Sequence, residues 1–97
     1  MPSYLVETYL ARSDARERLT RERRARSAAE ELTQMGTSVR FDRAIHVPED
    51  EMCFFVFEAP SGSDAAVAAE RAGLEALRVL EAISSHPVMP TDQRGDR

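Results

Sequence analysis

The chain has 97 residues, of which 42% are hydrophobic and 31% are charged, and its formal net charge at pH 7 is −4. This length fits one domain, and the acidic balance gives the molecule no general attraction for nucleic acid. The single cysteine, Cys53, excludes an internal disulfide and a cysteine-based zinc site. No apolar run approaches the about 18 residues of a membrane span, and no signal-peptide pattern opens the chain, so we expect a cytoplasmic protein.

The first part of the chain predicts a strand followed by a long helix. Tyr4–Leu10 is rich in β-forming residues. Residues 12–36 predict a helix that Ser13 or Thr20 could cap and that Gly36 ends. Its apolar positions follow three-four spacing and predict a core face of Ala25, Ala28, Ala29, Leu32 and Met35.

Residues 37–47 predict a second strand with an arginine on its apolar face. Strict alternation places on that face Val39, Phe41, Arg43, Ile45 and Val47. It places on the other face Arg40, Asp42 and His46. Because a buried guanidinium needs a carboxylate, we expect Arg43 to be partly buried and paired with Glu7 or Glu58.

The run Met-Cys-Phe-Phe-Val-Phe at residues 52–57 predicts a third strand, which follows a turn at residues 48–50. Alternate side chains leave a strand on opposite faces, and both faces of this strand are apolar. It should therefore be a central strand in a sheet that is covered on both sides. Two helices can cover one side, and we expect a second copy of the chain to cover the other.

The remainder predicts one more helix, one more strand and a tail. Pro60 ends the third strand, and Ser61 caps a helix with Asp64 at the capping-box position. That helix runs to residue 72 and stops at Gly73, and residues 77–83 form the last strand. We expect residues 1–83 to form the domain and residues 84–97 to be a disordered tail, because these have almost nothing to bury.

The element order is therefore βαββαβ, which predicts a ferredoxin-like α+β fold. Right-handed crossovers give a four-stranded antiparallel sheet of order 4-1-3-2 with both helices on one face. The doubly apolar third strand then lies at the centre. With a second copy on the open face, we expect a dimeric α/β barrel.

Four segments at this spacing resemble a known family: residues 4–7, 41–44, 57–61 and 70–74. The chain resembles the small ferredoxin-like domain-of-unknown-function family of high-GC bacteria whose members are often labelled nickel-binding. The resemblance covers roughly residues 3–83, and it implies a ferredoxin-like dimer and metal binding. All 13 basic residues are arginine, which fits a GC-rich genome.

Several polar side chains on the predicted strands are candidates for a site. The expected ligand pocket contains Glu7, Tyr9, Arg43, Glu58 and Glu81. Glu7 and His46 are the candidate general bases, and Glu7, His46 and Glu58 are the candidate metal ligands. Glu7, Glu58 and Glu81 would form an acidic pocket if they converged at one end of the sheet, which alternation alone does not establish.

Other residue types favour simpler roles. The chain has two histidines, and His86 lies in the expected tail, so we expect only weak nickel binding, through Glu carboxylates and His46. Cys53 reads as a small core residue, because no histidine accompanies it in a motif. His46 reads as solvated. Residues 12–26 hold seven arginines against three carboxylates, a local charge of +4, which favours a solvated helix face over RNA.

Two functions remain open at this point. The first is a homodimeric protein that binds a small molecule or metal ion between its sheet and the partner copy. The second is a cofactor-independent enzyme of the dimeric α/β-barrel kind, an oxygenase, cyclase or isomerase, with Glu7 or His46 as its base.

Overall fold

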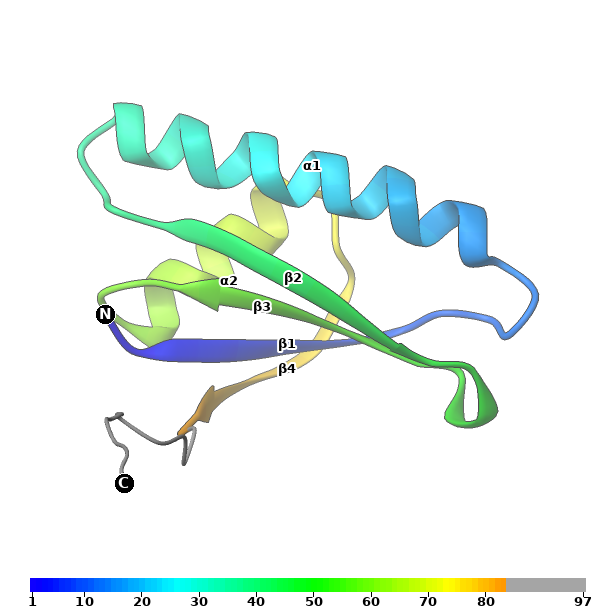
Figure 1. Cartoon of the computed structure of the whole chain (residues 1–97). Helices are drawn as coiled ribbons and strands as arrows, with labels where there is room; N and C mark the ends of the chain where they lie inside the picture. The colour runs from blue at the N-terminus through cyan, green and yellow to red at the C-terminus, as the bar shows by residue number, and fades with distance from the viewer. Residues whose placement is uncertain (84–97) are drawn as a thin grey trace, which may run out of the picture.

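Four strands and two helices alternate along residues 1–83, the part of the chain that this computed structural model describes. They are β1 (Ser3–Tyr9), α1 (Ala15–Gln34), β2 (Arg40–Val47), β3 (Met52–Glu58), α2 (Gly62–Arg71) and β4 (Ala76–Ala82). The strands form one antiparallel sheet of order β2-β3-β1-β4, and both helices lie on the same side of it (Figure 1). The predicted ferredoxin-like fold and strand order are confirmed, while the predicted tail lies outside the described residues. Within residues 1–83, neither helix combines the length and the apolarity that a membrane crossing requires.

The second helix begins and ends as the sequence predicts. The Ser61 hydroxyl accepts the backbone N–H of Asp64 at 3.2 Å and donates to the Asp64 carboxylate at 3.0 Å. After α2, Gly73 adopts a φ of +74°, a conformation that favours glycine. The start of α1 differs from the prediction, because Asp14 is its N-cap residue and makes no side-chain capping bond.

Alanine stripes on both helices face the aromatic centre of the sheet. Buried alanines line α1 at Ala25, Ala28 and Ala29 and α2 at Ala65, Ala68 and Ala69. Small side chains let the helices lie close to the sheet, where the ring of Phe41 contacts those of Phe55 and Phe57 at centroid distances of 6.2 and 5.4 Å. The predicted core face of α1 is correct except for Met35, which is 66% exposed because α1 ends just before it.

A β-bulge in β2 overturns the predicted alternation of that strand. Phe41 pairs with Phe57, whereas Arg43 pairs with Val56, so Asp42 is the extra residue. Phe41 consequently faces the helices, while Arg43, Ile45 and Val47 face the other side. The prediction that Phe41 and Arg43 share a face is wrong, because it assumed an unbroken period of two.

Candidate functional site on the open sheet face

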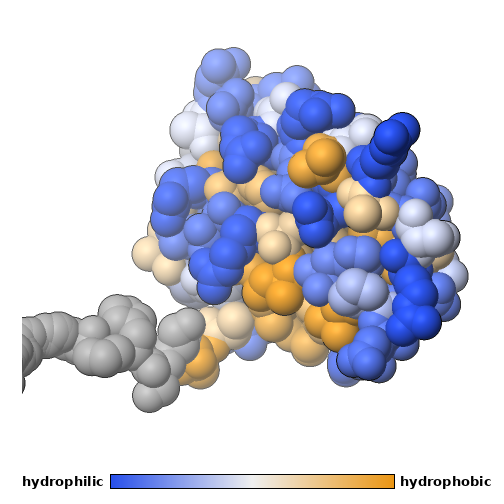
Figure 2. Space-filling model, turned by 45° about the vertical axis from the view of Figure 1, so that its right-hand side comes forward, coloured by the Kyte–Doolittle hydropathy of each residue, from blue (hydrophilic) through white to orange (hydrophobic). Residues whose placement is uncertain are grey.

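The face of the sheet that carries no helix is largely apolar. Its apolar side chains, placed by strand pairing, are Leu5, Ile45, Val47, Met52, Phe54, Val56 and Leu80. Ile45 is 40% exposed and Leu80 is 37% exposed, whereas the helix-facing side chains of β3 are fully buried. Figure 2 shows mainly hydrophilic residues at the height of α1 and larger apolar patches lower down, at the height of the strands. The open face is therefore more apolar than is usual for a protein surface in contact with solvent.

A hollow of about 310 Å³ lies on this open face at the end where β1 begins and β3 and β4 end. Its lining residues are Ser3, Leu5, Asp42, Arg43, Ile45, Val56, Glu58 and Ala82. The volume is at the lower end of the range of about 300–1,000 Å³ that is usual for small-molecule sites. Four of the eight lining residues are apolar and four are polar or charged, so the lining is more polar than that of most small-molecule sites.

Two ion pairs occupy the charged end of the hollow. Arg43 donates to Asp42 at 2.7 Å, and Arg40 donates to both carboxylate oxygens of Glu58 at 3.2 and 2.7 Å. The Glu58 carboxylate raises the pKa of Arg40 through these hydrogen bonds. The Arg43 side chain is 63% exposed, so the predicted buried pair with Glu7 or Glu58 is wrong. The bulge placed Asp42 beside Arg43 and turned both side chains away from the core.

The three strand carboxylates do not converge. Glu7 lies opposite Phe54 and Glu58 opposite Ser3, so the two are separated by four residues of β1, about 13 Å. Glu7 pairs with Arg78 at 2.5 Å. Glu81 lies opposite Tyr4, on the side of the sheet that faces the helices. A pocket formed jointly by all three carboxylates is therefore excluded within one copy.

Tyr9 ends β1 at the opposite end of the open face from the hollow. Its ring is largely exposed, and its hydroxyl donates to the Glu51 carboxylate at 3.4 Å. Tyr9 therefore belongs to the rim near the β2–β3 turn and does not line the hollow.

His46 and Cys53 lie directly opposite each other on β2 and β3, facing the helices. His46 is half-buried, and its Nε2 is buried with no hydrogen-bond partner among the described residues, so the prediction of a solvated side chain is wrong. Cys53 is fully buried, as expected, and burial raises the pKa of its thiol to about 11. Sequence reasoning missed this pairing, although the short turn at residues 48–50 fixes it by placing Val47 opposite Met52.

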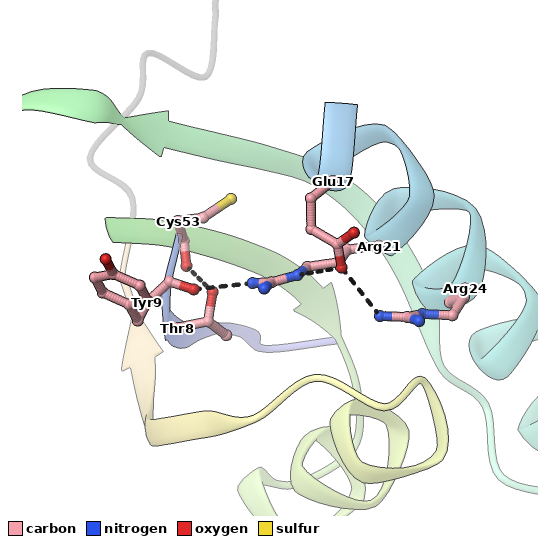
Figure 3. Close-up of polar contacts among 6 residues, drawn as sticks. All are labelled: Thr8, Tyr9, Glu17, Arg21, Arg24 and Cys53. Atoms are coloured by element: carbon pink, nitrogen blue, oxygen red, sulfur yellow. Dashed lines mark hydrogen bonds and ion pairs between the residues drawn. The ribbon is translucent and has the colours of Figure 1, made fainter. Parts of the chain in front are cut away.

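One arginine in the first half of α1, Arg21, bonds the helix to the sheet (Figure 3). Arg21 donates from Nη1 to the carbonyl of Tyr9 at 2.9 Å and from Nε to Glu17 at 3.2 Å. Glu17 also pairs with Arg24 at 3.8 Å, and the buried Thr8 hydroxyl donates to the carbonyl of Cys53 at 2.8 Å. Part of the arginine cluster is therefore structural.

Metal-binding side chains do not gather within one copy. Residues 1–83 contain no group of three or more His, Cys, Asp or Glu side chains placed to hold a metal ion. His46, a predicted metal ligand, is on the opposite side of the sheet from the predicted ligands Glu7 and Glu58. The second histidine, His86, lies outside the described residues.

The fold has a counterpart among solved structures. The crystal structure of SCO4226 from Streptomyces coelicolor A3(2) superimposes with a TM-score of 0.65 at 21% sequence identity, over 87% of this chain and 99% of that chain. At this identity the likeness establishes the fold alone. No protein-family model and no curated protein matches the chain.

Proposed function

We propose that the chain is a homodimeric binding protein whose open sheet faces pack together and enclose a pocket for a small ligand. The observation that carries the proposal is the hollow on the open face, which combines apolar walls with an exposed guanidinium. Ile45 in its lining is 40% exposed, and Leu80, which lies opposite the lining residue Leu5 and is 37% exposed, extends the apolar surface beyond it. Packing a second copy over this face would remove the apolar surface from water, which favours association.

The lining of the hollow defines the kind of ligand that it suits. Leu5, Ile45 and Val56 offer an apolar wall, and Arg43 stands at the charged end. The Asp42 carboxylate engages only one side of the Arg43 fork, at Nη1, and a guanidinium has five donors. We therefore expect a small molecule with an apolar body and one anionic group.

Nickel fits these residues poorly within one copy. The carboxylates in the hollow, Asp42 and Glu58, are both engaged by arginines, and no imidazole of residues 1–83 lines it. A divalent cation would have to displace those arginines or take ligands from a second copy. We expect weak nickel binding by the untagged full chain in calorimetry, and tight stoichiometric binding would contradict this assignment.

The enzyme alternative has less support. Glu7 is held in an ion pair with Arg78, whose Nε donates to one oxygen of the Glu7 carboxylate. His46 faces the helices and so cannot reach a ligand on the open face. Neither candidate base lines the hollow.

Sedimentation of two matched variants tests the dimer. Ile45→Arg places a charge on the open face, and Val67→Arg places the same charge on α2, where Val67 is 47% exposed. We expect the wild type and Val67→Arg to sediment as dimers at micromolar concentration and Ile45→Arg as a folded monomer. A monomeric wild type, or equal behaviour of the two variants, would refute association through the open face.

A further inference from the structure

The groove between α1 and α2 concentrates arginine side chains on the helix side of the sheet. A hollow of about 230 Å³ there is lined by Arg23, Arg24, Ser27, Ala28, Glu31 and Arg71. The two helices cover the face opposite the open face (Figure 1). A site in this groove is therefore independent of the proposed dimer pocket.

The groove carries an excess of positive charge. Arg71 pairs with Glu31 at 2.8 Å, and Glu31 is the one carboxylate among the lining residues. Arg23 makes no ion pair within residues 1–83. Three guanidinium groups thus line the groove with one carboxylate, and Arg24 has a second carboxylate, Glu17, outside the groove that it shares with Arg21. The groove is therefore locally positive on a protein whose net charge is −4.

Ion pairs hold two of the three groove arginines, Arg71 and Arg24. Arg24 is drawn towards Glu17, at 3.8 Å, and Glu17 is itself held by Arg21 (Figure 3). The Cζ of Arg24 lies close to Gly73, since a Cβ placed on that glycine would be 3.9 Å from it. The floor is the buried Ala28, whose small side chain leaves room between the helices.

We propose that this α1–α2 groove binds the phosphate group of a small phosphorylated molecule. Guanidinium forks match the oxygens of phosphate in geometry and charge, and the Ser27 hydroxyl adds a neutral donor. A phosphate dianion can use Arg23, which has no ion pair within residues 1–83, together with Arg24, which shares its carboxylate partner Glu17 with Arg21. A carboxylate ligand carries one charge and would use this pair of guanidinium groups less fully. The groove has no aromatic side chain among its lining residues, so it lacks the stacking surface that single-stranded RNA requires.

Calorimetric titration with pyrophosphate at low ionic strength tests the proposal on the full chain. We expect saturable binding that weakens about tenfold in Arg23→Ala and in Arg71→Ala, because each removes a charge-assisted contact. Arg16→Ala is the matched control: it removes the same charge from an exposed position of α1 outside the groove. It should weaken binding by no more than about twofold, through the screened long-range attraction.

Two further variants separate specific binding from general attraction. Arg23→Lys keeps the charge but loses the fork, and we expect it to recover only part of the affinity. Glu31→Gln should strengthen binding, because it removes the one carboxylate that lines the groove. Absence of saturable binding, an equal loss in Arg16→Ala, or tighter binding of an RNA oligonucleotide that all the arginine variants weaken alike would overturn the proposal.

Discussion

The two faces of this sheet are built from the same strands and differ in what covers them. On β3, Cys53, Phe55 and Phe57 point towards the helices and are fully buried, while Phe54 on the open face is only half-buried. The helix side is closed by alanines, and its aromatic rings share one buried cluster with them. The open face keeps apolar side chains that no helix within residues 1–83 covers, and it is there that the bulge places charged groups beside a hollow. The helix side of the sheet therefore forms the hydrophobic core, and the open face has the properties of an interface or binding surface.

The largest expected difference between the faces comes from truncating neighbouring phenylalanines. Phe55→Ala opens a cavity in the closed core and should lower the free energy of unfolding by about 3–5 kcal/mol. Phe54→Ala removes the same atoms from the open face and should cost clearly less in a monomer, because the site is already in contact with water. Urea unfolding of both variants makes the measurement.

The comparison of the two phenylalanines also reports on association. If the open face is buried in a dimer, the cost of Phe54→Ala should depend on protein concentration, whereas the cost of Phe55→Ala per folded monomer should not. Equal costs that are independent of concentration would remove the distinction between the faces.

A smaller effect is expected from the buried thiol at high pH. Burial raises the pKa of Cys53 from 9.0 to about 11, so the folded state keeps the proton that the unfolded chain loses. The contribution of the protonated thiol to the free energy of unfolding is therefore fully present below pH 9.0 and is lost as the pH rises from 9.0 to about 11. Across that window the folding equilibrium should weaken by at most about tenfold per pH unit, and by about 2 kcal/mol in total between pH 9 and 11 because the slope is smaller near each pKa.

Cys53→Ala provides the control for this pH dependence. The variant is less stable at neutral pH because it leaves a small cavity, but its unfolding free energy should change less between pH 9 and 11 than that of the wild type. Parallel pH profiles for the two proteins would show that the thiol is not protected by the helix side of the sheet.

The helix side of the sheet was largely predictable from the sequence, because the sequence patterns of its strands and helices are local and periodic. The doubly apolar run at residues 52–57, the alanine spacing in α1 and the cap at Ser61 each predicted an element that the structure contains. The strand order then followed from chain connectivity. Met35 was misassigned because its spacing continues the core face beyond the point where the helix ends.

The candidate site was much less predictable, because one extra residue decides which side chains face it. The bulge at Asp42 separates Phe41 from Arg43, and no glycine or proline in residues 40–47 marks it. The ion pairs of Glu7 and Glu58 also depend on which strands are neighbours and in which register. Alternation within one strand contains neither kind of information.

The smallest stability change is expected at Arg43, where the structure reverses the prediction from sequence. If Arg43 were paired within the core, removing either partner would lower the free energy of unfolding by on the order of 3–5 kcal/mol. Within one copy the side chain is 63% exposed and pairs with its neighbour Asp42, so Arg43→Ala should change the free energy of unfolding of the monomer by no more than about 0.5 kcal/mol. Thermal or urea melts supply this value.

The same variant should nevertheless affect binding at the open face. Anilinonaphthalene sulfonate combines an apolar body with one anionic group. We expect a fluorescence titration to show that this probe binds the folded wild type and binds Arg43→Ala more weakly. Arg12→Ala is a matched control, because it removes the same charge from an exposed residue that does not line the hollow. A strongly destabilised Arg43→Ala would mean that the guanidinium is buried. If the loss of stability scales with protein concentration, a second copy buries it; if it does not, the guanidinium is buried within one copy. Unchanged stability together with unchanged probe binding would remove Arg43 from both roles, and with it the charged end of the proposed pocket.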